Sequence, residues 1–152
     1  MPDALPPDQP HATRRSWMAV LARANADDLR AQLGQLPLYR VLRGPEAGLV
    51  MVRGRVGGGG AAFNLGEMTA TRCTVRTEDG FVGHAYVAGR NERLAELAAV
   101  ADALLQDPAR HDALIADVIE PLGAAQHARR DGMAAKAAAT RVQFFAMRNM
   151  RS

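Results

Sequence analysis

The sequence predicts an α+β protein with N-terminal helices, an antiparallel sheet of about four strands, and C-terminal helices. Apolar residues recur at helical spacing in residues 13–36 and again beyond residue 91. Between these segments, apolar and polar residues alternate, and Gly-Pro, Gly-Gly and Asp-Gly steps interrupt them, which is typical of strands joined by turns. A chain of 152 residues that is 48% hydrophobic is expected to form one domain.

The N-terminal region divides into a leader and a helical segment. Residues 1–12 contain four prolines and show neither helical nor strand periodicity, so we expect a leader without regular structure. A single domain is then expected over residues 13–148. Its first helical region covers 13–36, where Asn25 indicates a cap that restarts the helix and Pro37 marks the end.

Four strands are predicted in the middle of the chain, and they cover residues 39–43, 49–56, 69–77 and 81–87. Gly44-Pro45 is interpreted as a turn between the first two strands. A short apolar piece around Phe63 follows the glycine run. Asp79-Gly80 is a strong signal for a hairpin between the last two strands.

The C-terminal region is predicted to be helical with two interruptions. Asn91 can cap a helix that Asp107-Pro108 stops. A shorter helix around residues 114–119 is expected to break at Pro121. A long alanine-rich helix should then run from Ala124 to about Met147. A helix with so few large apolar residues either packs closely on a neighbour or extends from the domain to meet one.

Composition limits the possible functions. The formal net charge is +3, and the basic residues are almost all arginine, which suits anionic ligands or acidic protein surfaces. The single Cys73 excludes an internal disulfide, and the histidines lack the spacing of a metal site, so we expect no metal. Neither a membrane span nor a secretion signal is evident, so we expect a cytoplasmic protein without membrane contact. The first helical region lacks a convincing recognition helix, so no nucleic acid is expected.

Arginines beside glycines form the most informative motif. Arg53 and Arg55 precede the run from Gly57 to Gly60, and together they offer positive charge and freely oriented backbone N–H groups to an anion. Neither lysine nor hydroxyl follows these glycines, so the motif is not a P-loop. Arg72 and Arg76 share a strand face, and four arginines could line one surface if the two strands are neighbours. The alternative is a solvated loop and an ordinary polar strand face.

Other polar residues could join this surface. Glu67 could form a salt bridge to one of the arginines or act as a base, and His84 could be structural or catalytic. We expect Cys73 to be a buried thiol. We identify no catalytic residue from the pattern. The candidate residues for binding an anion or a partner are Arg53, Arg55, Gly57, Gly58, Gly60, Glu67, Arg72, Arg76, His84 and Arg90.

Several motifs resemble those of one protein family over about residues 13–148. They are Thr13-Arg-Arg-Ser-Trp-Met, Arg55-Val-Gly-Gly-Gly-Gly, Phe63-Asn-Leu-Gly-Glu-Met-Thr-Ala-Thr-Arg-Cys73, Gly83-His84, Val87-Ala-Gly-Arg90, Ala101-Asp-Ala-Leu-Leu105 and Arg141-Val-Gln-Phe-Phe-Ala-Met147. Together they resemble PhnG, the G subunit of the phosphonate carbon–phosphorus lyase core complex. Gly59 departs from the family's threonine, and Asn91-Glu92 stands where the family often has Asp-Lys.

The resemblance implies a subunit of a multiprotein transferase of phosphonate catabolism, alpha-D-ribose 1-methylphosphonate 5-triphosphate synthase. In that reaction a phosphonate displaces adenine from ATP. The resemblance further implies that the chain is not catalytic alone, that the other core subunits and especially the large I subunit are its partners, and that ATP and phosphonate are substrates of the complex and not cofactors of this chain. A stand-alone anion- or nucleotide-binding module is the alternative, and a purely structural organiser is a third possibility.

Overall fold

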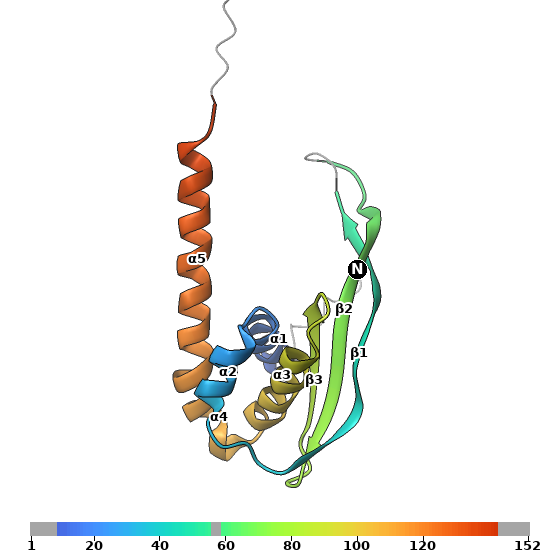
Figure 1. The fold of residues 1–152 in the computed structure, drawn as a ribbon, viewed down its shortest axis with the longest axis vertical. Helices are drawn as coiled ribbons and strands as arrows, with labels where there is room; N and C mark the ends of the chain where they lie inside the picture. Colours follow the sequence, from blue (N-terminus) through green and yellow to red (C-terminus); the bar gives the residue numbers. More distant parts are fainter. Residues whose placement is uncertain (1–8, 56–58, 143–152) are drawn as a thin grey trace, which may run out of the picture.

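The computed structural model describes residues 9–55 and 59–142, and it confirms the α+β class. Helices α1 and α2 come first, three strands follow, and a helical C-terminal part completes the chain (Figure 1). The helices are α1 (Gln9–Leu21), α2 (Ala26–Leu33), α3 (Glu92–Leu105), α4 (Pro108–Leu114), the π-helical turn η1 (Ile115–Ile119) and α5 (Glu120–Ala139). The strands are β1 (Tyr39–Gly54), β2 (Phe63–Thr77) and β3 (Val82–Ala88).

The sheet in the described part of the chain has three strands and not about four. Its order is β1-β2-β3, with both pairs antiparallel. The expected turn at Gly44-Pro45 is wrong, because β1 continues through it and absorbs the extra residues as register shifts against β2. Gly44 has a φ of +73°, and a Cβ there would lie 2.5 Å from the Arg72 carbonyl oxygen. Pro45 is tolerated because β1 is an edge strand.

The strand bounds also differ at the other end of this hairpin. The apolar piece around Phe63 is the beginning of β2 and not a separate element, so β2 begins six residues before the predicted strand at Thr69. The hairpin between β2 and β3 lies where Asp79-Gly80 predicts it. The two turn signals therefore had different outcomes. At Gly44-Pro45 the chain keeps pairing with β2 and does not turn, whereas at Asp79-Gly80 it turns as predicted.

The core lies between one face of the sheet and helix α3. The buried strand residues Cys73, Val75, Ala85 and Val87 face α3, which buries nearly every residue from Leu94 to Leu105. Small side chains let the two layers approach closely. A Cβ on Gly83 would lie 1.9 Å from the Ala99 carbonyl oxygen, so this contact requires glycine. Alanines contribute much of this core, and α3 alone supplies five of them: Ala95, Ala98, Ala99, Ala101 and Ala103.

The helices begin and end differently from the prediction in three places. Helix α1 begins at Gln9, before Thr13. The predicted break at Pro121 is wrong, because the helical conformation continues from η1 into α5. Pro121 lies in the first turn of α5, directly after the wider turn of η1. Helix α5 ends at Ala139 and not near Met147, and the Thr140 hydroxyl donates to the carbonyls of Lys136 and Ala137 there.

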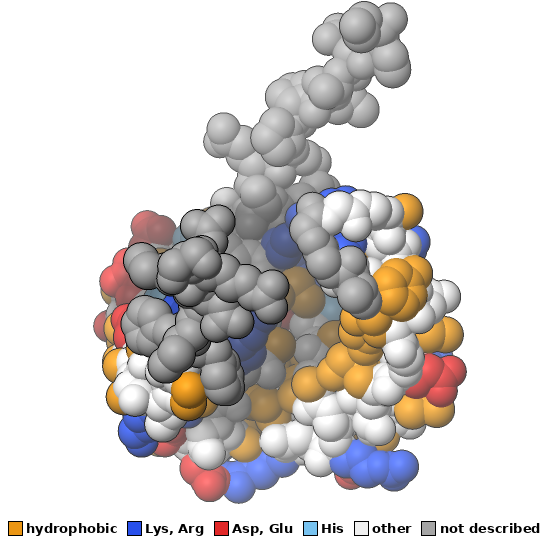
Figure 2. Space-filling view, turned by 90° about the horizontal axis from the view of Figure 1, so that it is seen from above, with side chains coloured by type: hydrophobic (Ala, Val, Ile, Leu, Met, Phe, Trp, Pro, Cys, Tyr) orange, Lys and Arg blue, Asp and Glu red, His pale blue; other side chains and the backbone are white. Residues whose placement is uncertain are grey.

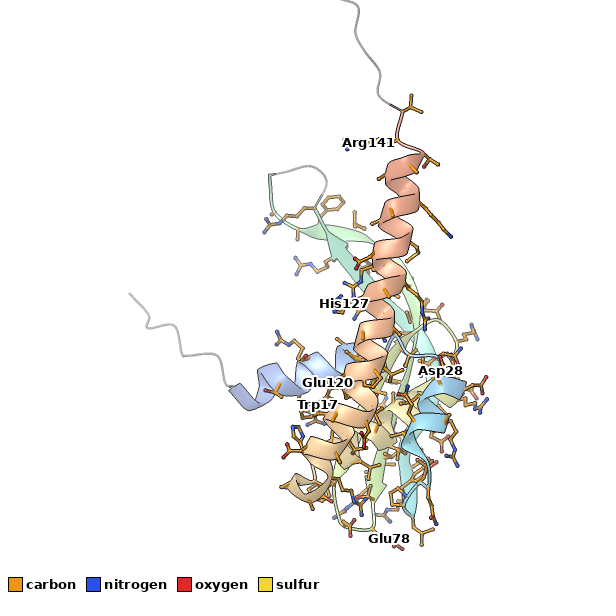
Figure 3. All side chains as sticks on the ribbon, turned by 90° about the vertical axis from the view of Figure 1, so that its left-hand side faces the viewer. Trp17, Asp28, Glu78, Glu120, His127 and Arg141 are labelled. Atoms are coloured by element: carbon orange, nitrogen blue, oxygen red, sulfur yellow. The ribbon has the colours of Figure 1, made fainter. Side chains whose placement is uncertain are left out.

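Two elements project beyond the packed body. Strand β3 ends at Ala88, opposite Ala70, so β1 and β2 continue past it as a two-stranded ribbon. We call residues 49–55 and 59–69 the hairpin arm. Helix α5 rises on the other side of the molecule in the same direction (Figure 1), from Glu120 past His127 towards Arg141 (Figure 3). Beyond Gln126 all described α5 residues are exposed.

Candidate functional site

The candidate site is the face of the sheet that α3 does not cover, which we call the open face. Along β2, Cys73, Val75 and Thr77 point to the core, and alternation therefore places Arg72, Thr74 and Arg76 on the open face. The register extends this surface over the neighbouring strands. Arg72 lies between Glu46 and Tyr86, Thr74 between Arg43 and His84, and Arg76 between Arg40 and Val82.

A carboxylate between two guanidinium groups is the most organised part of the open face. Glu46 Oε1 accepts a hydrogen bond of 2.6 Å from Arg72 Nε and one of 2.8 Å from Arg43 Nε. The hydrogen bonds from Arg43 and Arg72 lower the pKa of Glu46, and the Tyr86 hydroxyl and then Glu46 raise the pKa of Arg72. All of these side chains stay accessible to solvent. The cluster fixes the direction of Arg72 and still leaves its remaining N–H groups for another anion.

The remainder of the open face is also basic. Arg40 and Arg76 lie directly opposite each other, and like charges at such a pair repel unless an anion lies between them. His84 Nδ1 lies 3.1 Å from the Thr74 hydroxyl, so the His84 ring is held by a neighbour on the open face. The three cross-strand rows centred on Arg72, Thr74 and Arg76 thus contain four arginines and one glutamate. This makes the open face suitable for an acidic partner or a phosphate-bearing ligand.

The arginines of the sequence motif do not form one cluster with Arg72 and Arg76. The strands are neighbours, as expected, but Arg53 lies opposite Asn64. Eight residues of β2 separate this position from Arg72, which is about 26 Å along a strand. Arg53 donates to the carbonyl of Ala62, and Arg55 lies just past the end of β1. The motif therefore belongs to the tip of the hairpin arm and not to the open face.

The other predicted candidates are scattered. Glu67 lies on the arm opposite Met51, exposed. Gly60, with a φ of +107°, has no atom within 4 Å of the position of a Cβ, so it is an open loop position. Gly57 and Gly58 lie outside the described residues.

Arg90 occupies a turn that is held rigidly to β2. The buried Thr71 hydroxyl donates to the Gly89 carbonyl at 2.6 Å and accepts from the Asn91 backbone N–H at 3.0 Å. The Asn91 side chain in turn caps α3 by accepting from the Leu94 N–H, as predicted. Thr71 and the Gly89-Arg90 step, which lie in two of the family motifs, thus join β2 to the start of α3.

The sequence pattern missed a buried carboxylate that joins three elements. Asp102 of α3 is fully buried and accepts from Arg14 Nε (3.1 Å), Arg14 Nη2 (2.7 Å) and Trp17 Nε1 (2.9 Å), all on α1. It also accepts from the backbone N–H of His84 on β3 at 2.9 Å. These four bonds satisfy both oxygens, so Asp102 is a structural anchor for α1 and β3.

One signal could have found this anchor. Asp102 interrupts a run of Ala, Leu and Val on a helix that is apolar over most of its surface, and a carboxylate in such a position must be paired. What the pattern does not contain is the identity of the partners, which lie 85 and 88 residues earlier in the chain.

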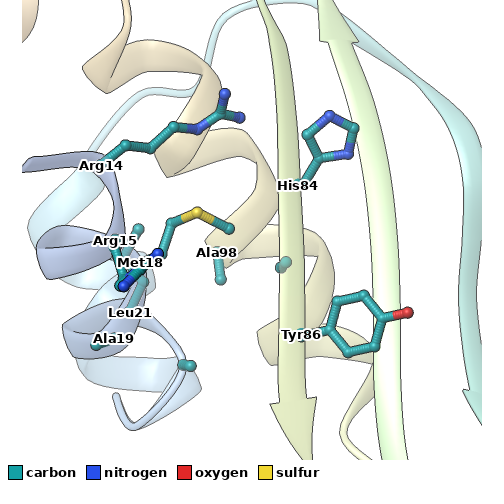
Figure 4. Close-up of a pocket in the computed structure, with 10 residues that line it drawn as sticks. Arg14, Arg15, Met18, Ala19, Leu21, His84, Tyr86 and Ala98 are labelled. Carbon is teal, nitrogen blue, oxygen red and sulfur yellow. The ribbon is translucent and has the colours of Figure 1, made fainter. Parts of the chain in front are cut away.

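A cavity of about 580 Å³ lies between α1 and the edge strand β3. Arg14, Arg15 and Met18 line one side, and His84 and Tyr86 the other. In Figure 4, Met18 extends from α1 towards β3, whereas the rings of His84 and Tyr86 lie beyond that strand, on the open face. The β3 side of the cavity is therefore mainly strand backbone, and the two rings serve the open face.

Reactive groups on the core side are held in their neutral form. Cys73 is buried, as predicted, and burial raises the pKa of its thiol to about 11, which keeps it from acting as a nucleophile near neutral pH. Burial and a 2.7 Å hydrogen bond to Glu96 raise the pKa of Tyr39 to about 12. Within residues 9–55 and 59–142, His, Cys, Asp and Glu side chains form no group that could hold a metal ion. None of the helices described is long and apolar enough to cross a membrane.

Fold and site together define an α+β protein with an arginine-lined open sheet face and two elements, the hairpin arm and α5, that project beyond the packed body. The chain belongs to the family described as phosphonate metabolism protein PhnG, whose model matches residues 12–149. It is similar to the alpha-D-ribose 1-methylphosphonate 5-triphosphate synthase subunit PhnG of Rhizobium meliloti (strain 1021). The two are 45% identical over 139 residues, which are 90% of this chain and 88% of the relative.

Proposed function

We propose that this chain is a subunit of an alpha-D-ribose 1-methylphosphonate 5-triphosphate synthase in the carbon–phosphorus lyase core complex. In the reaction that the family resemblance implies, a phosphonate oxygen forms a bond to the ribose C1′ of ATP, the bond from C1′ to adenine breaks, and adenine leaves with a proton. The chain supports this displacement within an assembly and contributes surfaces to it.

The observation that carries the proposal is the similarity to a named synthase subunit over nearly the whole of both chains. The states of the potentially reactive side chains Cys73 and Asp102 agree with a supporting role. Cys73 is neutral and buried, and Asp102 uses both oxygens for α1 and β3, so neither acts on a substrate. Guanidinium groups predominate on the open face, and they bind and orient anions without exchanging protons.

The large I subunit is the partner that we propose for this chain, with contact to the open face as the primary role of Arg72 and its neighbours. Charge complementarity at such a face fixes partner choice and orientation more than it adds affinity. Holding the triphosphate of ATP is a second use of the same arginines. We also propose a cytoplasmic location, where ATP is available.

The experiment that tests the proposal is light scattering after size-exclusion chromatography, on this chain alone and after co-expression with the other synthase subunits. A stable assembly that contains this chain and forms the ribose triphosphate product supports the proposal. A chain that remains separate while the other subunits form a complete, active synthase contradicts it.

The single substitutions Arg72→Ala and Arg55→Ala compare the contribution of the open face with that of the tip of the hairpin arm. Removing Arg72 leaves Glu46 with Arg43 only, so we expect at least a tenfold loss of complex activity or assembly, about the value of one charge-assisted contact. Arg55 lies on the arm tip and tests that region independently. Unchanged turnover and assembly of both variants would remove these residues from the proposal.

The alternative, a stand-alone anion- or nucleotide-binding module, is favoured by one observation, the facing pair Arg40 and Arg76 on the open face. Titration calorimetry separates the two hypotheses. A module binds ATP without any other subunit, whereas a subunit that only completes an assembly releases no heat with ATP alone.

A further inference from the structure

Backbone alternation decides which groups of β3 face away from the sheet. Just beyond the two ends of β3, the Gly89 N–H donates to the Thr69 carbonyl and the Thr77 N–H donates to the Phe81 carbonyl. In an antiparallel pair, residues that exchange backbone hydrogen bonds alternate with residues that do not. The register between β2 and β3 runs without a shift, so the odd-numbered residues of β3 bond to β2. The even-numbered residues therefore direct their N–H and C=O groups outward.

These outward groups are capped in the first half of β3 and uncapped in the second. Gln106 Nε2 donates to the Val82 carbonyl at 2.7 Å, and Asp102 accepts from the His84 N–H at 2.9 Å, so α3 caps the edge as far as His84. The next three groups bond to no other residue in the described part of the chain: the His84 carbonyl, the Tyr86 N–H and the Tyr86 carbonyl. We call these three groups the uncapped edge. Such groups pair readily with another extended chain.

The uncapped edge lies beside the cavity of about 580 Å³ between α1 and β3. Met18, Ala19 and Ala22 line it from α1, and Ala98 lines it from α3, so the core side of this space is apolar. In Figure 4, α1 stands apart from β3, and Met18 extends into the space between them. The rings of β3 lie beyond the strand and do not cover its edge. The cavity therefore offers room for a chain alongside the uncapped groups.

Basic side chains border the uncapped edge. Arg15 is exposed, lines the cavity from α1 and forms no ion pair with another residue in the described ranges. Arg72 lies opposite Tyr86, on the open face. Figure 2, the view from above, shows basic and hydrophobic side chains together in the hollow between the helices and the sheet. A segment that carries carboxylates beside apolar side chains would find partners for both.

We propose that the uncapped edge of β3 takes up an extended, acidic segment of a partner subunit as a fourth strand of the sheet. The inference rests on the proposed function, because a subunit has such a partner. The residue of the segment that faces Tyr86 would exchange two backbone hydrogen bonds with it and direct an acidic side chain to the open face, near Arg72. Its two neighbours would direct apolar side chains towards Met18 and Ala98. A further carboxylate would pair with Arg15.

An extended polypeptide fits this edge better than a small anion does. Two of the three uncapped groups are the carbonyl oxygens of His84 and Tyr86, which repel a phosphate, whereas a strand brings an N–H group to each of them. The chain's own residues 1–8 include Pro2, Pro6 and Pro7, which have no N–H group to donate. A segment from another subunit meets both requirements, the donors and the negative charge.

Hydrogen exchange tests the proposal on the wild-type chain, free and in the assembly with the other synthase subunits. The Tyr86 amide points outward, so it should exchange quickly in the free chain and at least about 100-fold more slowly in the assembly. The His84 amide is the internal control, because Asp102 accepts from it in both states, and its rate should change less than about threefold. Rates are measured by mass spectrometry with single-residue resolution. A Tyr86 amide that exchanges equally fast in both states overturns the proposal.

A matched pair of variants separates strand pairing from ordinary burial. Tyr86→Pro removes the outward N–H and no hydrogen bond between β2 and β3, so an edge strand tolerates it. Tyr86→Ala removes the same ring and keeps the N–H. Each variant competes with the wild-type chain for the co-expressed subunits, and thermal unfolding checks its fold. We expect the proline variant to enter the assembly at least about tenfold less than the alanine variant. Equal entry contradicts strand pairing, and if the proline variant does not fold, the exchange rates decide.

Charge reversal tests the acidic character of the segment. Arg15→Glu should reduce entry into the assembly at least about tenfold at low salt, whereas Lys136→Glu, the same change on the exposed part of α5, should reduce it less than about threefold. Equal effects of the two substitutions contradict an acidic segment at this edge.

The outcomes separate this inference from the proposed function. If the wild-type chain does not enter the assembly, the proposed function fails. If it enters and the Tyr86 amide stays unprotected, only the fourth strand fails. A Tyr86 amide that is protected in the free chain and loses protection when residues 1–8 or 143–152 are deleted would assign the edge to a terminal segment of this chain. Protection that rises with the concentration of the free chain would assign it to a second copy. Either result overturns the partner segment.

Discussion

The two halves of the β1–β2 ladder follow the same alternating pattern and have different surroundings. In the lower half, Cys73 and Val75 are buried under α3, and Gly83 of β3 lies against the same helix. In the upper half, Leu49 and Met51 point to the same side and are more than half exposed. Alternation therefore identifies which side chains share a face, but only the length of the covering helix decides which of them this chain buries by itself.

The largest effect should come from the anchor of the packed half. Asp102→Ala leaves the guanidinium of Arg14 and the N–H groups of Trp17 and His84 without their acceptor, so we expect the free energy of unfolding in urea to fall by about 3 kcal/mol. Asp27→Ala is the control, because Asp27 pairs with Arg93 between two exposed side chains and should cost less than about 1 kcal/mol. Equal losses in the two variants would remove Asp102 as an anchor.

A pair of glycines compares the two halves directly. Gly83→Ala introduces a Cβ that would lie 1.9 Å from the Ala99 carbonyl oxygen, so β3 and α3 must separate, and we expect a loss of about 2 kcal/mol. Gly66→Ala in the arm meets no atom within 4 Å and should be neutral or slightly stabilising. The comparison uses the midpoints of thermal unfolding. A destabilising Gly66→Ala would show that the arm is packed in solution.

Alkaline pH should weaken the packed half through two groups. Burial raises the pKa of Cys73 from 9.0 to about 11, and burial and Glu96 raise that of Tyr39 from 10.0 to about 12. Above pH 9 the unfolded chain binds fewer protons than the folded chain, so the free energy of unfolding should fall as pH rises from 9 to 11. Tyr39→Phe should reduce that slope above pH 10. An unchanged slope would show that Tyr39 ionises equally in both states.

The smallest effect on stability should come from the open face. Glu46→Gln removes an exposed carboxylate from between Arg43 and Arg72, and solvent screens such pairs, so its unfolding midpoint should change much less than that of Gly83→Ala. A midpoint as low as that of Gly83→Ala would contradict the assignment of this cluster to the surface. The same substitution should still alter assembly, because it frees the direction of Arg72.

Local signals predicted the elements whose ends are set by short-range chemistry. The Asn25 and Asn91 caps, the stop at Asp107-Pro108 and the hairpin at Asp79-Gly80 lie where the sequence places them. The errors occur where a neighbouring element overrides a local signal. Gly44-Pro45 continues as a bulge because β2 offers a partner ladder, and Pro121 continues the helix because the wider turn before it accommodates the missing N–H.

The site was predicted in its residue types and not in its grouping. Arg72, Arg76 and His84 lie together on the open face, but Glu46 and Tyr86 join them through a register that the sequence alone does not contain. The same register moves Arg53 to the far end of the sheet. The structural role of Asp102 was not predicted, because its partners on α1 are distant in the chain. Its position in an apolar helix does indicate that its carboxylate must be hydrogen-bonded.

The separation of Arg14 and Asp102 in the chain also has a consequence during synthesis on the ribosome. Helix α1 leaves the ribosome first, and Arg14 must then wait for 88 further residues before its carboxylate has been made. At bacterial rates of about 5 to 20 residues per second, this wait lasts roughly 4 to 18 s. The nascent α1 thus spends seconds with Trp17 unburied, and chaperones have that interval in which to bind it before α3 closes the fold.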